Sequence, residues 1–108
     1  MNILKNKPLL LAAIDQYELY TKGQKDILKI LISLCIDDIV KVGTTYLSEK
    51  TGLSRASIYL NLKKFAQEKL IVKTRKAGER HDSYRLNEEK LDYILQLYQN
   101  KKAMESDR

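Results

Sequence analysis

Residue types that form disulfides and metal sites are scarce in this sequence. Its 108 residues include one cysteine, one histidine, one proline and no tryptophan. The single Cys35 excludes an intramolecular disulfide and a cluster of thiolate ligands for a metal ion. A lone cysteine on an apolar helix usually fills space in a core, so we expect Cys35 to be buried. We expect no metal or other cofactor.

Long hydrophobic runs are also absent. No apolar stretch approaches the roughly 20 residues that a membrane-spanning helix needs. The residues 8–14 follow two lysines and are apolar, but Asp15 and Glu18 come soon afterwards and no small-x-small cleavage site is evident. We therefore read this stretch as a helix and not as a signal peptide. The sequence predicts a cytoplasmic protein without a membrane partner.

Catalytic and nucleotide-binding motifs are missing as well. His81 stands beside Asp82 in a predicted loop, and no nucleophile accompanies the pair. A general base needs a fixed position next to the group that it deprotonates, which a loop supplies poorly. The patterns GxxxxGK, GxGxxG and HExxH do not occur. We predict that the protein is not an enzyme.

The positive charge of the chain is concentrated in one segment. The net charge is +6, and residues 54–85 alone hold nine Lys or Arg against three Asp or Glu. The segments 1–53 and 86–108 are nearly neutral. Charge that served only solubility would have no reason to gather in this way. Localised basic charge is typical of a surface that binds a polyanion.

The segment 44–71 predicts two helices joined by a tight turn. Gly52 falls where the turn needs a positive φ, and Ser54 stands where the next helix needs an N-cap. Apolar residues in the second helix recur at i, i+4 and i+7, which is the spacing of one buried stripe. The apolar side of this unit comprises Leu47, Leu53, Ile58, Leu62 and Phe65.

The second helix keeps a polar, basic outer face. An ordinary αα-hairpin with a solvated surface is the alternative, and the helix pattern alone does not separate the two. An α-helix fits the major groove of B-DNA, where its first residues reach base edges and flanking groups hold phosphates. The outer face comprises Arg55, Ser57, Tyr59, Lys63 and Lys64, with Ala56 allowing close approach.

The flanking segments supply further elements. Residues 8–20 suit a helix with Pro8 in its first turn, and residues 22–36 a second helix with Thr21 and Gln24 as a capping box. A short strand at 39–44 precedes the helical pair. We expect the second helix to bury Ile27, Leu31, Leu34 and Cys35.

After the helical pair, residues 71–86 read as two strands around a turn at Gly78. Asn87 then caps a last helix that begins at Glu88, and the chain from 101 to 108 reads as a polar, frayed tail. We divide the chain into a helix at 1–20, a core at 21–86, a helix at 87–100 and a tail at 101–108.

This order resembles the winged helix-turn-helix fold, and in detail the MarR-like and ArsR-like regulators. The resemblance covers roughly residues 21–98 and is strongest from Thr45 to Leu86. Two residues depart from the family pattern: Lys69, where Gly is usual, and Leu60, where a polar residue is frequent. Leu60 either touches a thymine methyl or turns inward. The matching positions are Thr45, Leu47, Gly52-Leu53-Ser54, Ile58, Leu62, Phe65, Leu70-Ile71 and Tyr84-Arg85-Leu86.

The resemblance implies a mainly α protein with a small β-hairpin wing, in the order α-α-β-α-α-β-β-α. It implies a transcriptional regulator that inserts residues 54–68 into the major groove of double-stranded DNA and is nucleoid-associated when bound. A plasmid or phage protein of replication or partition is an alternative. A protein-interaction module that binds no DNA is another, although the position of the charge disfavours it. The sequence does not identify an effector ligand.

The candidate contact residues fall into three groups. Arg55, Ser57, Tyr59 and Asn61 are predicted to read bases. Thr44, Thr45, Ser54, Lys63, Lys64, Lys73 and Arg75 are predicted to contact phosphates. The predicted wing residues are Lys76, Gly78 and Arg80.

Two apolar stripes on the terminal helices predict a homodimer, because the core is already supplied by the residues between them. A monomer that folds both stripes onto its own body is the alternative. The stripes comprise Leu10, Ile14 and Tyr17 on the first helix and Leu91, Ile94, Leu95 and Tyr98 on the last.

Overall fold

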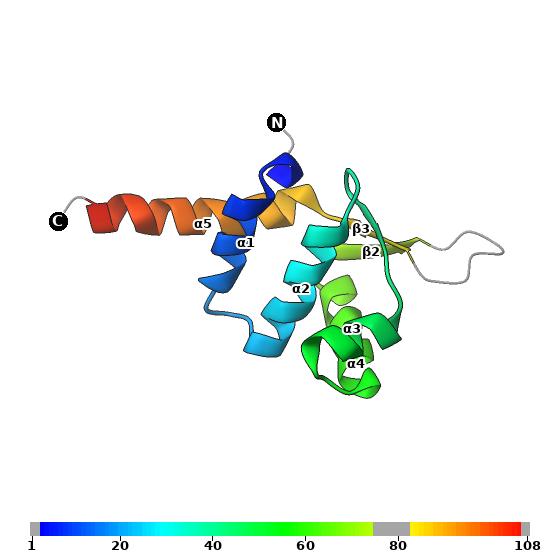
Figure 1. Cartoon of the computed structure of the whole chain (residues 1–108). Coiled ribbons are helices and arrows are strands. Elements are labelled where there is room, and N and C mark those ends of the chain that lie inside the picture. The colour runs from blue at the N-terminus through cyan, green and yellow to red at the C-terminus, as the bar shows by residue number, and fades with distance from the viewer. Residues whose placement is uncertain (1–2, 75–82, 107–108) are drawn as a thin grey trace.

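The computed structural model of the chain describes residues 3–74 and 83–106. One small antiparallel sheet lies at the side of a group of helices, as Figure 1 shows. After a short 3-10 helix, the order is α-α-β-α-α-β-β-α, which confirms the predicted winged helix-turn-helix. The elements are η1 (Ile3–Lys5), α1 (Lys7–Asp15), α2 (Lys22–Leu34), β1 (Ile39–Lys41), α3 (Thr44–Thr51), α4 (Arg55–Gln67), β2 (Ile71–Thr74), β3 (Ser83–Leu86) and α5 (Glu88–Ser106).

The predicted apolar side of the helical pair lies in the core. Leu47, Ile58 and Phe65 are fully buried, and Leu62 is nearly so. Burying a side chain of this size contributes about 1.5–3 kcal/mol relative to leaving it in water. This burial fixes which side of α4 faces inward and therefore which side remains exposed.

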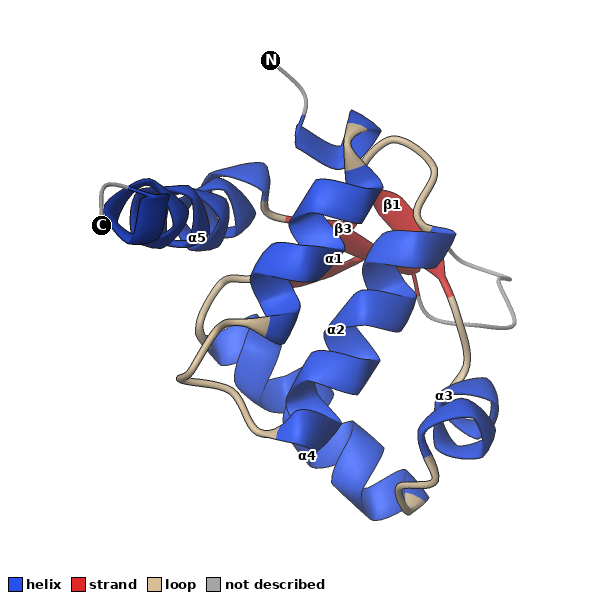
Figure 2. Ribbon diagram, turned by 60° about the vertical axis from the view of Figure 1, so that its left-hand side comes forward, coloured by secondary structure: helices blue, strands red, loops and turns tan. Residues whose placement is uncertain are grey.

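The three strands form one sheet in the order β1-β3-β2. β3 pairs with both neighbours in antiparallel register, with Val40 opposite Tyr84 on one side and Ile71 opposite Leu86 on the other. The predicted short strand before the helical pair is thus an edge of the sheet. Figure 2 shows α1 and α2 crossing in front of this sheet, with α3 and α4 at one end.

The buried stripe of α2 differs from the prediction. Leu34 is 42% exposed, whereas Leu28 and Ile32, which were not predicted, are fully buried. Apolar residues occupy most positions of the second half of α2, so several stripes were possible. Tertiary packing buries the side of α2 that contains Ile32, and Leu34 lies outside this packed side. Cys35 is buried, as predicted.

α1 ends at Asp15 and is therefore shorter than the helix predicted at 8–20. Two lysines of α2 bind this end: Lys25 donates to the carbonyl of Asp15 at 2.8 Å, and Lys29 to its carboxylate at 2.7 Å. Cations at a helix C-terminus satisfy its last carbonyl groups and complement its dipole. The bond to Asp15 also raises the pKa of Lys29.

The apolar stripes of the terminal helices pack against the body of the same chain. Most of the residues predicted for a dimer interface are buried there within the single chain, whereas the sequence predicted that they face a partner. Because α1 lies between α2 and α5, both helices can cover their apolar sides within one chain. The buried members are Leu10, Ile14, Leu91, Ile94 and Leu95, while Tyr17 and Tyr98 are half-buried.

α5 is longer than the predicted helix at 87–100. Asn87 caps it as predicted, with its Oδ1 accepting from the backbone N–H of Glu89 at 3.0 Å. The helix continues to Ser106 through residues of the predicted polar tail. Residues 88–106 contain neither Gly nor Pro to end it. Within the described ranges, no helix is long and apolar enough to cross a membrane.

Candidate nucleic-acid interface

Hydrogen bonds within the turn fix the angle between α3 and α4. Gly52 ends α3 with a φ of 77°, the left-handed conformation predicted for it. The Ser48 hydroxyl donates to the carbonyl of Leu53 at 2.6 Å, and the Leu53 N–H donates to Thr51 at 3.2 Å. Ser54 caps α4 as predicted by accepting from the N–H of Ser57 at 3.1 Å. The two helices therefore form one rigid unit.

The outer face of α4 is open to solvent. Arg55 stands exposed in its first turn, and Tyr59 and Leu60 are 60% and 63% exposed. Leu60 thus points outward, which answers the question left open by the sequence. Lys63 is exposed and forms no ion pair with any described residue. A positively charged face with an apolar centre results.

Asn61 lies differently from the other predicted base-reading residues. It is half-buried, and its Oδ1 accepts from Nε2 of Gln24 on α2 at 3.2 Å. Its Nδ2 donates to Oγ of Ser57 at 3.4 Å. Both ends of the amide are thereby engaged inside the protein, unlike the exposed side chains of Arg55 and Tyr59.

Lys64 is held by a small polar cluster at the end of α4. Its Nζ lies 3.9 Å from a carboxylate oxygen of Glu68 and 5.9 Å from the ring centroid of Tyr20. The Tyr20 hydroxyl donates to Glu68 at 3.0 Å. Burial and this hydrogen bond raise the pKa of Tyr20. The Tyr20 ring also packs edge-to-face on Phe65, with centroids 5.5 Å apart, and so connects the residues before α2 to α4.

The remaining predicted phosphate contacts lie around the same unit. Thr44 and Thr45 are exposed in the first turn of α3, and Lys73 is exposed on β2. β2 and β3 form the two arms of the predicted hairpin. The predicted phosphate contact Arg75 and the predicted wing residues Lys76, Gly78 and Arg80 lie outside the described residues.

Gln24 is the residue of this region that sequence reasoning missed. Its place in the capping box was predicted and is confirmed, but its contact with Asn61 joins positions 37 residues apart. No periodicity or spacing signals such a contact. In residues 3–74 and 83–106, no group of three or more His, Cys, Asp or Glu side chains is placed to hold a metal ion.

The arrangement of α3, turn, α4 and hairpin strands defines a winged helix-turn-helix protein. No family model matches the sequence, and neither does any curated protein. Solved structures do match. A variant of ZitR from Lactococcus lactis in complex with DNA has a TM-score of 0.55 and 24% identity. The match covers 81% of this chain and 57% of that one. ZitR is described as a zinc-responsive member of the MarR family.

Two further proteins of known structure are similar over more of the chain. The adhesin competence repressor AdcR from Streptococcus pyogenes has a TM-score of 0.54 and 18% identity, covering 97% of this chain and 74% of that one. YusO from Bacillus subtilis has a TM-score of 0.53 and 19% identity, covering 95% and 70%. At these identities the similarity establishes the fold. The chain spans 57 to 60% of the length of the ZitR chains.

Proposed function

We propose that this chain is a sequence-specific double-stranded DNA-binding protein that regulates transcription. The proposal rests on one observation: the excess positive charge coincides with a solvent-exposed side of α4. The excess charge of residues 54–85 belongs to α4 and the hairpin segment, and α4 presents its basic side to solvent while its apolar side is buried. A rigid, basic helix of this kind fits the major groove.

The side chains of α4 take different roles in this proposal. Arg55, at the start of the helix, is placed for a bidentate contact with guanine, and Leu60 for a thymine methyl. Lys63 and the threonines of the first turn of α3 bind phosphates, which fix the register of the protein on the duplex without reading sequence. A DNA complex of ZitR, whose fold is similar, supports this docking.

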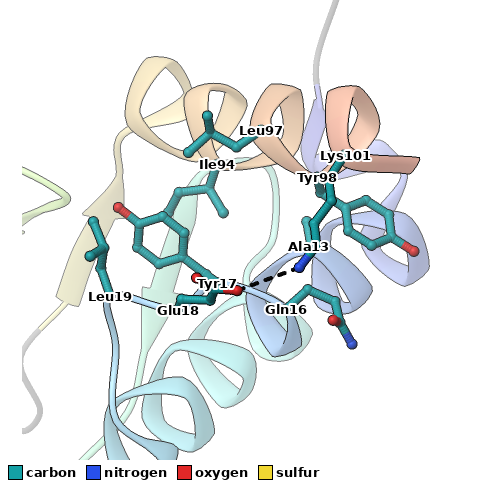
Figure 3. Close-up of a pocket in the computed structure, with 9 residues that line it drawn as sticks. All are labelled: Ala13, Gln16, Tyr17, Glu18, Leu19, Ile94, Leu97, Tyr98 and Lys101. Atoms are coloured by element: carbon teal, nitrogen blue, oxygen red, sulfur yellow. Dashed lines mark hydrogen bonds and ion pairs between the residues drawn. The ribbon is translucent and has the colours of Figure 1, made fainter. Parts of the chain in front are cut away.

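We infer that two copies associate through the outer side of α5 and residues 16–19, in place of the buried stripes. Leu19, Leu97 and Met104 are 75%, 41% and 73% exposed. A hollow of about 380 Å³ lies between these two segments, lined by Tyr17, Leu97 and Tyr98 among others (Figure 3). Exposed apolar surface on one side of a helix favours association.

The DNA-binding proposal is tested with single alanine variants and salt titrations. A preferred duplex is first selected from random sequences. Arg55→Ala should lower affinity for the preferred duplex by roughly five- to 150-fold, equivalent to about 1–3 kcal/mol, and affinity for random duplexes much less. Lys63→Ala should weaken both alike.

Lys5→Ala is the matched control, because Lys5 is exposed on η1, at the end of the molecule away from α3 and α4 (Figure 1). It should leave both affinities nearly unchanged. Equal losses on specific and random duplexes in Arg55→Ala would refute the base-reading role. Binding that does not weaken as salt rises would refute the proposed function.

A further inference from the structure

A chain of hydrogen bonds runs from the start of α2 to the outer face of α4. The backbone N–H of Thr21 donates to Oε1 of Gln24 at 3.0 Å. Nε2 of Gln24 donates to Oδ1 of Asn61 at 3.2 Å, and Nδ2 of Asn61 donates to Oγ of Ser57 at 3.4 Å. Four groups from two helices are thereby connected in series.

The direction of every bond in this chain follows from its first member. A backbone N–H only donates, so it fixes the oxygen of the Gln24 amide towards Thr21 and leaves the amino group of Gln24 for Asn61. The Asn61 amide must then present its oxygen to Gln24 and its amino group to Ser57. A reversed orientation of either amide would place two donors or two acceptors face to face.

Close packing shields the Gln24 end of the chain from water. Gln24 is only 8% exposed, and Asn61 is half-buried. A Cβ atom on the neighbouring Gly23 would lie 3.2 Å from Cδ1 of Leu53, so glycine allows the first turn of α2 to approach the α3–α4 turn closely. In such surroundings an amide left without its partner costs about 1–3 kcal/mol, which holds the chosen orientation.

The chain determines what Ser57 can offer to a ligand. Its oxygen accepts from Asn61, and its hydroxyl hydrogen has no acceptor among the described residues. A serine hydroxyl has one donor and two acceptor positions, so the acceptor side is partly used inside the protein. The donor is left for a group outside it.

We propose that Gln24 and Asn61 are positioning residues that make Ser57 a hydrogen-bond donor, and thereby set which base α4 accepts at one position. The inference rests on the proposed DNA-binding function. In the major groove guanine offers the acceptors N7 and O6, and cytosine offers only the N4 donor. A donating Ser57 therefore favours guanine over cytosine at the base that it faces.

The test exchanges guanine for cytosine at that base. A duplex is selected with the unsubstituted protein, and Ser57→Ala locates the base pair at which discrimination disappears. The unsubstituted protein should prefer guanine there by roughly three- to tenfold, the worth of one hydrogen bond. In Asn61→Asp the carboxylate accepts from Gln24 but has no donor for Ser57. The hydroxyl then turns inward to donate, and the preference should vanish or reverse.

Two variants separate this effect from charge and from misfolding. Gln67→Glu adds the same negative charge at an exposed position of α4 and should weaken binding to both duplexes equally. Gln24→Met breaks the chain without adding charge and should reduce discrimination without reversing it. Far-UV circular dichroism confirms that each variant retains its helices.

The outcomes distinguish the two proposals. If Asn61→Asp weakens binding to the guanine duplex and the cytosine duplex by the same factor, the positioning role is overturned and the DNA-binding proposal is not affected. In the Ser57→Ala background, this equal weakening is the expected result of Asn61→Asp. An unsubstituted protein that shows no salt-dependent binding to any duplex would overturn the DNA-binding proposal and this inference together.

Discussion

Lys69 adopts a backbone conformation that favours glycine. Its φ is 61°, and it ends α4 in a Schellman motif, in which the N–H of Leu70 donates to the carbonyl of Phe65 at 2.9 Å. Both of these apolar residues are buried. The carbonyl of Lys69 also accepts from Nδ2 of Asn87 at 2.9 Å, which connects this helix end to the start of α5. The surrounding contacts therefore hold Lys69 in a strained conformation.

Replacing Lys69 with glycine should stabilise the protein. Relief of the left-handed strain is worth about 1–2 kcal/mol, and the added freedom of the unfolded chain offsets about 0.4–1 kcal/mol of it. We expect Lys69→Gly to raise the free energy of unfolding in urea by up to about 1.5 kcal/mol. Lys69→Ala keeps the Cβ atom and should give no gain. Equal stabilisation by both substitutions would show that charge, and not backbone conformation, is responsible.

Among the secondary-structure elements, the helical pair α3–α4 and the hairpin β2–β3 are held in place by different interactions. The angle between α3 and α4 is fixed by hydrogen bonds in the turn and by burial of Leu47 and Phe65. β2 and β3 are fixed by their register against each other, and β3 also by its pairing with β1. The sequence between these strands, residues 75–82, holds Arg75, Lys76 and Arg80.

The hairpin segment should contribute to the salt dependence of DNA binding. Replacing Arg75, Lys76 and Arg80 with glutamine should reduce the slope of log K against log salt by about 0.9 for each phosphate that the protein no longer neutralises. Fluorescence anisotropy with a random duplex measures this slope. The same exchange at Lys5, Lys101 and Lys102 removes equal charge from the terminal elements and should change the slope less. An unchanged slope in the first variant would mean that this segment does not touch phosphates.

At the scale of the whole molecule, the protein is elongated, with extents of 54 × 29 × 22 Å. The C-terminal half of α5 extends beyond the body in Figure 1, and residues 99–105 are exposed on all sides. An extended helix with Leu97 and Met104 on its surface is well placed to pack against a second copy. A two-fold dimer would place two α4 helices on half-sites about 34–36 Å apart.

The dimer proposal is tested by Leu97→Glu, with Leu34→Glu as a control of nearly equal exposure, 41% against 42%. Because Leu97 is outside the core, its substitution should preserve helicity while halving the mass in solution and weakening specific DNA binding. Leu34→Glu should leave the mass unchanged. Light scattering after size exclusion measures the mass. An unsubstituted protein that is already monomeric without DNA, at tens of micromolar, would overturn the proposal.

Features that depend on neighbours along the chain can be predicted from the amino-acid order alone. Gly52 must end α3 because only a residue tolerant of positive φ suits that turn, and Ser54 and Asn87 cap helices through groups two or three residues away. The inward side of α4 follows from the spacing of its apolar residues. These interactions lie within about one helical turn, so the local pattern is sufficient to predict them.

Which surfaces meet depends on how the helices and strands pack in three dimensions. The apolar stripes of the terminal helices were visible in the sequence, but a stripe does not say whether it meets its own chain or a partner. The position of α1 between α2 and α5 placed Leu10 and Leu91 in one core. The hydrogen bond of Gln24 to Asn61 joins residues distant in sequence, and it changed Asn61 from a predicted base reader into a proposed support for Ser57. Such interactions depend on the relative position of whole helices, which local periodicity does not encode.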